Sequence, residues 1–205
     1  MKNLKLSKWN ENESKFDVKI LPYDIIAFLP KSFCQKFISF FSGLFCHIGF
    51  IEYGYNLKNL LQKIDFPEKL LPQSDKMYVI SASIKYRGVF FEEFNSIKNK
   101  YGGYYIFRVR NITDLERHLL RIYAITSIGK FYDVFQLGRI FLNLLFKIGI
   151  TISFRKEFGG LICSEFVSIP LSFILGLKFE KKLKYNTPDD VVIHEEIDFL
   201  KEEVF

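Results

Sequence analysis

Cysteine is scarce in this sequence, and its distribution excludes several kinds of protein. The 205 residues include three cysteines, Cys34, Cys46 and Cys163, an odd number with no CxxC spacing. A disulfide framework or a zinc knuckle needs paired, regularly spaced cysteines. We therefore expect reduced thiols in a cytoplasmic, reducing compartment, and we expect no metal and no other cofactor.

The chain also lacks the marks of an exported or membrane-spanning protein. Its start, MKNLKLSKWNENESKF, has no apolar stretch of the kind that signal peptides carry. The apolar segment 32–45 is too short to span a bilayer. Segment 134–154 is long enough, but Arg139, Asn143 and Lys147 recur on one helical stripe. We predict an amphipathic helix there, which suits peripheral contact with a membrane better than a span.

A dense block of one charge is missing as well. Lysine and arginine number 29 against 23 aspartates and glutamates, so the formal net charge is +6. Such an excess can favour nucleic acids, anionic membranes or acidic substrates. The basic residues are scattered and do not alternate with exposed aromatics in a stripe, so we interpret them as a solvated surface. No nucleic-acid partner is expected.

No internal repeat and no Pro/Gly/Ser-rich linker divides the chain, so residues 1–205 are expected to form one domain. Hydrophobic residues make up 49%, enough for a substantial core. Strands followed by helices make an α+β domain. From periodicity we predict strands over 23–29, 46–53, 76–84, 88–94 and 104–110, and helices over 32–45, 57–64, 113–130, 134–150 and onward from Cys163, with a further segment at 187–197.

The segment LICSEFVSIP, residues 161–170, places a cysteine at the expected start of a helix. A helix N-terminus and a nearby imidazolium both favour the thiolate, which is the reactive form of the side chain. Cys163 is therefore either a nucleophile or a small core residue. If it is the nucleophile, we expect it to be alkylated before Cys34 and Cys46. Pro170 is expected to kink or interrupt this helix.

A catalytic thiol needs a histidine, and the chain has three. His118 lies within a predicted helix, on a face that we expect near the surface. His194 lies in an acidic tail segment. His47 lies on a predicted strand, CHIGFIEYG, where Gly49 leaves space on the same face of the strand. His47 is the best candidate partner.

Several segments together resemble a known family. In order they are YDIIAF, CHIGFIEYG, YVISAS, RGVFFEEF, GKFYDVF, LICSEFV and TPDDV. They resemble the permuted NlpC-type papain-like cysteine hydrolases, in particular the YiiX-like group, which has viral and phage members. The resemblance runs from about Pro22 to Val192. It implies an α+β, circularly permuted papain-like fold in which an antiparallel sheet packs against helices, with the histidine before the cysteine.

The resemblance also implies roles for individual residues. Cys163 matches the nucleophile, and His47 matches the general base that takes its proton. The backbone amides of Cys163 and Ser164 would face the developing oxyanion. Tyr132, in FYD, matches a tyrosine that the family often places near the site, although a core aromatic is an equally good interpretation.

Two positions depart from the family pattern. Ser81 stands where a third, acidic residue would be, and a serine can orient an imidazole without stabilising its charge. A one-residue shift in register would make Ser83 the match, since both point to one face of the strand. Glu52 is a rival orienter, but its parity opposes His47. At the start, PYD (22–24) replaces the family's GD, which leaves the geometry of the first turn open.

The resemblance implies a thiol hydrolase, an amidase, peptidase or esterase, that works through an acyl-cysteine intermediate. Its substrates would be peptides, amides or lipid esters. One alternative is a lipid-directed acyltransferase or thioesterase on the same fold, as in the lecithin retinol acyltransferase-like relatives. Another is a non-catalytic binding module that has lost the acidic third residue.

Overall fold

The computed structural model describes residues 19–133, 161–179 and 186–204. Within them, strands form one six-stranded sheet in the order β4-β3-β2-β1-β5-β6, and every neighbouring pair is antiparallel. The strands are β1 (Ile25–Leu29), β2 (His47–Tyr53), β3 (Met77–Ser83), β4 (Gly88–Glu93), β5 (Gly103–Val109) and β6 (Ile197–Val204). With the helices around it, this sheet confirms the α+β class and the antiparallel sheet.

The strands predicted from the sequence are present, and the differences lie at their ends. β1 begins at Ile25 because Tyr23 adopts a φ of 66°, a left-handed conformation that turns the chain before the strand. This is a backbone conformation that favours glycine, and here a tyrosine adopts it. β6 was not predicted, since Lys201, Glu202 and Glu203 interrupt the alternation of apolar and polar residues that is typical of a strand. Charge of this kind is typical of an edge strand.

The helices begin at well-defined caps, and Pro170 does not interrupt the helix that contains it. Capping boxes at Ser32, Thr113 and Thr187 begin three of the helices. The helix that Pro170 was expected to kink or interrupt is not interrupted and continues to Leu175, with residues up to Leu171 buried in the core. The helices are α1 (Phe33–Ser42), α2 (Gly54–Gln62), η3 (Glu68–Leu70), α3 (Phe94–Lys98), α4 (Asp114–Thr126), α6 (Cys163–Leu175) and α7 (Pro188–Val192). The predicted helix 134–150 lies outside the described residues.

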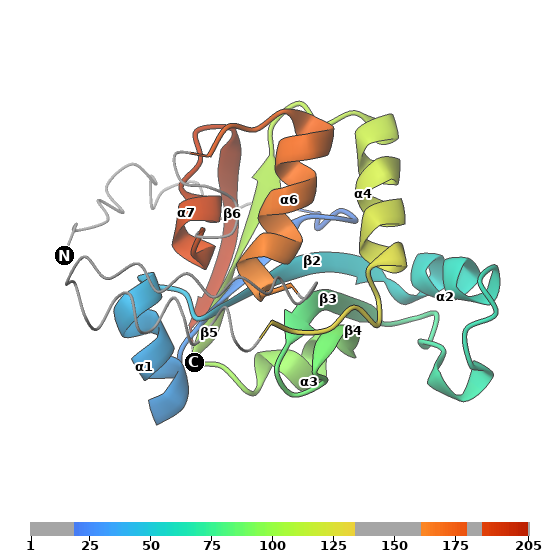
Figure 1. Cartoon of the computed structure of the whole chain (residues 1–205), viewed down its shortest axis with the longest axis horizontal. Helices are drawn as coiled ribbons and strands as arrows, with labels where there is room; N and C mark the ends of the chain where they lie inside the picture. Colours follow the sequence, from blue (N-terminus) through green and yellow to red (C-terminus); the bar gives the residue numbers. More distant parts are fainter. Residues whose placement is uncertain (1–18, 134–160, 180–185, 205) are drawn as a thin grey trace, which may run out of the picture.

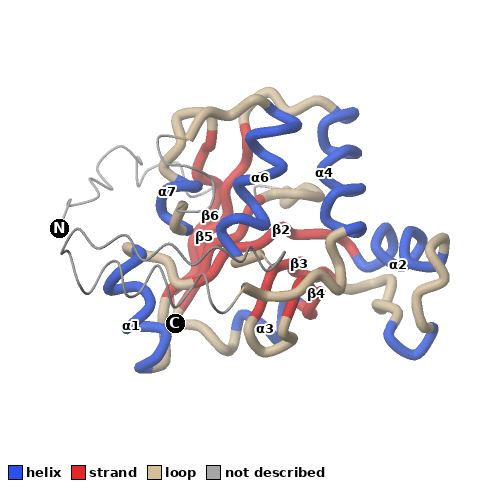
Figure 2. Tube along the Cα trace, in the orientation of Figure 1, coloured by secondary structure: helices blue, strands red, loops and turns tan. Residues whose placement is uncertain are grey.

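The two faces of the sheet carry separate apolar clusters. Alternation along β2 places Ile48 and Phe50 in the larger cluster, with residues of α2, α4, α6 and α7. Ile51 points the other way, into a smaller cluster with Phe94 and Ile97 of α3. Figure 1 shows α4, α6 and α7 on one side of the sheet and α3 on the other. Figure 2 shows the strands in the middle of the molecule with helices around them. None of the described helices is both long and apolar enough to cross a bilayer.

A buried ion pair fixes the start of β1 against β5. The side chain of Asp24 is fully buried, and it accepts hydrogen bonds from Arg108 Nε at 2.8 Å and from Arg108 Nη2 at 2.6 Å. It also accepts a bond from the Leu21 backbone amide at 2.7 Å, which holds the turn before the strand. The pair therefore ties the first turn to the centre of the sheet.

We expect Arg108→Met to destabilise the protein by about 3 kcal/mol, because it leaves the Asp24 carboxylate buried without its cation. Arg110 provides a matched control, since its ion pair with Asp198 is about half exposed on both sides. Arg110→Met should cost no more than about 1 kcal/mol. Urea unfolding monitored by circular dichroism measures both changes. Equal costs would contradict a structural role for the Asp24–Arg108 pair.

Candidate functional site

Cys163 is the first residue of α6, as the sequence predicted. The backbone amide of Ile162, one residue before it, donates to the Glu165 carboxylate at 3.3 Å, so Glu165 caps the helix from within its first turn. Leu161 forms a parallel bridge with Tyr132, which anchors the approach to the helix. Cys163 itself is 8% exposed. The thiol is thus fixed at a helix start but is largely shielded from solvent.

The sulfur of Cys163 lies against backbone amides. Burial raises the pKa of the thiol to about 11, and hydrogen bonds from the amides of Ile48, Ser164 and Cys163 itself act in the opposite direction. The ladder between β2 and β3 begins only at Phe50 and Ile80, so the amide of Ile48 lies beyond the paired part of the strand. In this structure burial outweighs the helix start, and the expected lowering of the thiol pKa is not found. The amide of Ser164 does lie at the sulfur, where an oxyanion donor was expected.

His47 is the first residue of β2, and its ring is fixed on two sides. Nε2 lies 3.0 Å from the Ser81 hydroxyl oxygen on β3. The Tyr101 ring stacks on it, with centroids 5.7 Å apart and planes 3° from parallel. Burial lowers the pKa of His47 to about 4. The imidazole is therefore neutral at pH 7, with Nε2 engaged by Ser81.

The residue of β3 that contacts the His47 ring is Ser81, and its role as an orienting residue stays a prediction. Ser83 lines the same cavity, but the contact to the ring is made by Ser81. A side chain at Gly49 would place its Cβ 2.9 Å from the Ser81 Cβ and 2.7 Å from the Ile80 carbonyl oxygen. Glycine at this position is what lets Ser81 approach the strand that carries His47.

Glu52 serves another purpose, as its parity predicted. Its buried carboxylate accepts hydrogen bonds from Arg121 Nε at 3.0 Å, from Asn56 Nδ2 at 3.0 Å and from the Tyr53 backbone amide at 2.8 Å. These partners hold β2 against α2 and α4. Glu52 is therefore a structural residue and does not orient His47.

Cys163 and His47 approach the same stretch of β2 from different sides. The sulfur lies at the Ile48 amide and packs in the larger core cluster, whereas the His47 ring points to the side of Ser81 and Tyr101. Among the described residues, no hydrogen bond joins the sulfur to the imidazole. Direct pairing of the two groups stays a prediction.

The charge of Cys163 acts on two tyrosines, Tyr101 and Tyr132. Burial raises the pKa of Tyr101, and the charges of Cys46 and Cys163 raise it further. Burial also raises the pKa of Tyr132, followed by the charge of Cys163. Tyr132 thus lies near the thiol, as the resemblance implied. Tyr101 was missed, since nothing in the sequence distinguishes it from the other tyrosines.

A cavity of about 200 Å³ opens on the side of the sheet where His47 and Ser81 lie. Most of its other residues come from the β3–β4 hairpin and from the segment after α3, which are far from His47 in sequence. No sequence pattern pointed to them. The lining residues are Gln35, His47, Ser81, Ser83, Lys85, Tyr86, Phe90, Glu92, Ile97, Lys100 and Tyr101.

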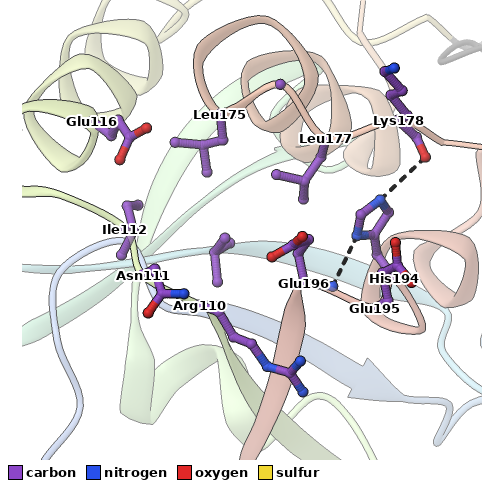
Figure 3. Close-up of a pocket in the computed structure, with 12 residues that line it drawn as sticks. Arg110, Asn111, Ile112, Glu116, Leu175, Leu177, Lys178, His194, Glu195 and Glu196 are labelled. Atoms are coloured by element: carbon purple, nitrogen blue, oxygen red, sulfur yellow. Dashed lines mark hydrogen bonds between the residues drawn. The ribbon is translucent and has the colours of Figure 1, made fainter.

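A second cavity, of about 370 Å³, lies at the opposite end of α6, where Leu175 and Lys178 line it. His194 is one of its lining residues (Figure 3). Its Nε2 lies 3.2 Å from the Lys178 carbonyl oxygen, and its Nδ1 accepts a hydrogen bond from the Glu196 backbone amide at 3.2 Å. Cys163 and this end are the two ends of a helix of 13 residues, which is about 20 Å long at the usual rise per residue. The larger cavity is therefore separate from the candidate thiol site, and His194 is not a partner of Cys163.

The exposure of the thiols argues against the expected order of alkylation. Cys34 is exposed, whereas Cys46 and Cys163 are both buried. Burial raises the pKa of Cys46 to about 12. We now expect a small alkylating reagent to modify Cys34 first. His118 is exposed on α4, as predicted.

Comparison with solved structures gives a similarity in fold. The chain matches the Escherichia coli O157:H7 protein described as metalloprotein yiiX, DUF1105, with a TM-score of 0.59 and 18% sequence identity. The match covers 92% of this chain and 100% of that one. Among the described residues here, no group of three or more His, Cys, Asp or Glu side chains could hold a metal ion. No protein-family model matches the sequence, and no curated protein matches it. The fold is therefore YiiX-like.

Protonation of His47 should weaken the fold. Its pKa is lowered from 6.5 to about 4 in the folded state, so the unfolded chain binds more protons between these values. Stability should therefore fall as the pH drops from about 6.5 to 4, by an amount on the order of 3 kcal/mol. His47→Gln removes this titration and should flatten that part of the profile.

Urea unfolding at a series of pH values measures this effect. His118→Gln, at an exposed position of α4, is the matched control and should follow the wild type. If His47→Gln and His118→Gln give the same profile, His47 is not held neutral by burial.

Proposed function

We propose that the chain is a thiol hydrolase, an amidase, peptidase or esterase, with Cys163 as nucleophile and His47 as general base. The observation that carries the proposal is the 3.0 Å contact between His47 Nε2 and the Ser81 hydroxyl, which fixes the orientation of the ring through that nitrogen. It leaves Nδ1 as the nitrogen that can serve the thiol. The position of Cys163 at the first residue of α6, against the Ile48 amide, supports the same assignment. The YiiX-like fold agrees with it.

The resting state constrains the mechanism. With the thiol pKa raised to about 11 and the His47 pKa lowered to about 4, the pair rests as neutral thiol and neutral imidazole. The thiol proton must then move to His47 as the sulfur attacks the carbonyl carbon, and not before. The carbonyl oxygen becomes an oxyanion, to which the amides of Cys163 and Ser164 would donate.

The second half of the reaction returns the proton. The bond from the carbonyl carbon to the leaving group breaks, and the leaving atom takes the proton from the His47 imidazolium. The acyl group stays on the Cys163 sulfur as a thioester. Water, deprotonated by neutral His47, then attacks the thioester and releases the acid and the thiol.

Two alternatives share the site. A lipid-directed acyltransferase or thioesterase would use the same acyl-cysteine with another acceptor, and Phe33, 84% exposed on α1, suits contact with a membrane surface. A non-catalytic binding module is favoured by the neutral resting pair and by the serine that replaces the carboxylate. Under that alternative, the site binds a ligand without turnover. A cytoplasmic location remains a prediction for all three.

We expect the purified protein to hydrolyse at least one member of a panel of aryl esters, acyl thioesters and peptide amides. Cys163→Ala should abolish the activity. His47→Gln should lower kcat/KM by about 10²–10⁴-fold, the usual contribution of a general base. Ser81→Ala should lower it by roughly tenfold or less, because a neutral hydrogen bond contributes about 1 kcal/mol.

Cys34→Ala removes the exposed thiol and should leave the activity unchanged. Mass spectrometry of the quenched reaction should find the acyl group on the peptide that contains Cys163. Turnover that survives in Cys163→Ala would refute the nucleophile. Binding of these compounds without any turnover would favour the binding module instead.

A further inference from the structure

The cavity beside His47 and Ser81 is unusual in its charge. Two lysines, Lys85 and Lys100, line it together with one carboxylate, Glu92. Lys100 is in ion-pair contact with Glu92, and Lys85 Nζ lies 3.6 Å from the same carboxylate. Two ammonium groups thus share one carboxylate, which leaves an excess positive charge in the cavity.

Lys100 is the more shielded of the two ammonium groups. Its nitrogen is shielded from solvent, and apart from the ion-pair contact it has no hydrogen-bond partner among the described residues. Burial, followed by the close approach and the charge of Lys85, lowers the pKa of Lys100 to about 8. Lys85 Nζ donates to the Tyr86 hydroxyl at 3.0 Å and is more exposed. An anion placed between the two lysines would relieve their repulsion and balance the positive charge that Glu92 alone leaves uncompensated.

The rest of the cavity limits what the anion can be attached to. Phe90, Ile97 and Tyr101 contribute apolar wall, and His47 and Ser81 also line the cavity. The volume is about 200 Å³. Since one water occupies about 30 Å³ in the liquid, this leaves room for a group of several non-hydrogen atoms, not for a long chain.

Building on the proposed thiol hydrolase, we propose that this cavity binds a small leaving group that carries a carboxylate, held by Lys85 and Lys100 within reach of His47. In an amide substrate, the bond from the carbonyl carbon to the leaving nitrogen breaks. The electron pair stays on that nitrogen, which takes the proton from the His47 imidazolium. The acyl group remains on Cys163. The substrate class is then the N-acyl amino acid or a close relative, with the carboxylate near the scissile bond.

The test uses three probes that differ in one group: N-acetylglycine, the neutral N-acetylglycinamide and the phosphonate analogue of N-acetylglycine. Binding to the full-length Cys163→Ala protein is measured by calorimetry, so that no turnover interferes. N-acetylglycine should bind at least about tenfold more tightly than the amide, as expected for a hydrogen bond to a charged group. Equal binding of the two would overturn the proposal, and tighter binding of the phosphonate would overturn the choice of a carboxylate.

Variants locate the binding. Lys100→Met should weaken N-acetylglycine by about tenfold or more and leave N-acetylglycinamide unchanged. Lys85→Met, at a more exposed position, should also weaken the binding of N-acetylglycine. It replaces Lys100→Met in the test if that variant does not fold. Glu92→Gln removes the competing carboxylate and should strengthen binding. Lys63→Met, exposed at the end of α2, is the control and should change nothing. Unchanged affinity in both Lys100→Met and Lys85→Met would overturn the site.

Kinetics separate this inference from the proposed function. If the wild-type protein hydrolyses neutral and carboxylate-bearing amides with the same kcat/KM, the proposed hydrolase function stands and the proposed carboxylate site is refuted. If N-acetylglycine binds in a way that depends on the two lysines but is not hydrolysed, the carboxylate site stands and the proposed hydrolase function is refuted.

Discussion

The candidate site depends on the point at which β2 leaves β3. β2 pairs with β1 from His47 onward, but it pairs with β3 only from Phe50. The short unpaired edge between these residues leaves the amide of Ile48 facing the Cys163 sulfur. It also leaves room for the His47 ring to reach Ser81 across the gap. A fully paired β2 would satisfy that amide with β3 and would exclude the thiol.

A buried carboxylate near the C-terminus holds the chain in position just before this point. Asp189, in the TPDD segment of α7, accepts hydrogen bonds from the backbone amides of Leu44 at 2.7 Å and Phe45 at 2.8 Å. Gly43 makes the approach feasible, because a Cβ there would lie 2.2 Å from an Asp189 oxygen. The segment that enters β2 is thereby fixed by a residue 144 positions away. Charge-assisted bonds of this kind are among the stronger ones in a protein.

Burial is the dominant electrostatic influence at the site. It raises the pKa of Cys163 and lowers that of His47, so both groups rest uncharged. The same burial, with a second lysine nearby, depresses the pKa of Lys100 in the adjoining cavity. A low-dielectric pocket penalises each isolated charge but strengthens any pair of opposite charges formed within it. An anionic ligand and a developing imidazolium would both gain from that environment.

The sequence by itself determined the local features, because they depend on neighbours along the chain. The strands 46–53 and 76–84, the capping box at Thr113 and the helix start at Cys163 follow from periodicity and capping. The parity of the strand excluded Glu52 as the orienter of His47, whereas Ser81 was singled out by the resemblance.

Only the tertiary structure decided what depends on packing between distant segments. β6 needed β5 as a partner, since its own charged sequence carries little strand signal. α6 continues through Pro170 because the core on one side holds it. The protonation states of Cys163 and His47 reversed the expectation from a helix start, because burial depends on everything packed around them. The cavity with Lys85 and Lys100 exists only where the β3–β4 hairpin meets the segment after α3, and no spacing in a linear sequence encodes that meeting.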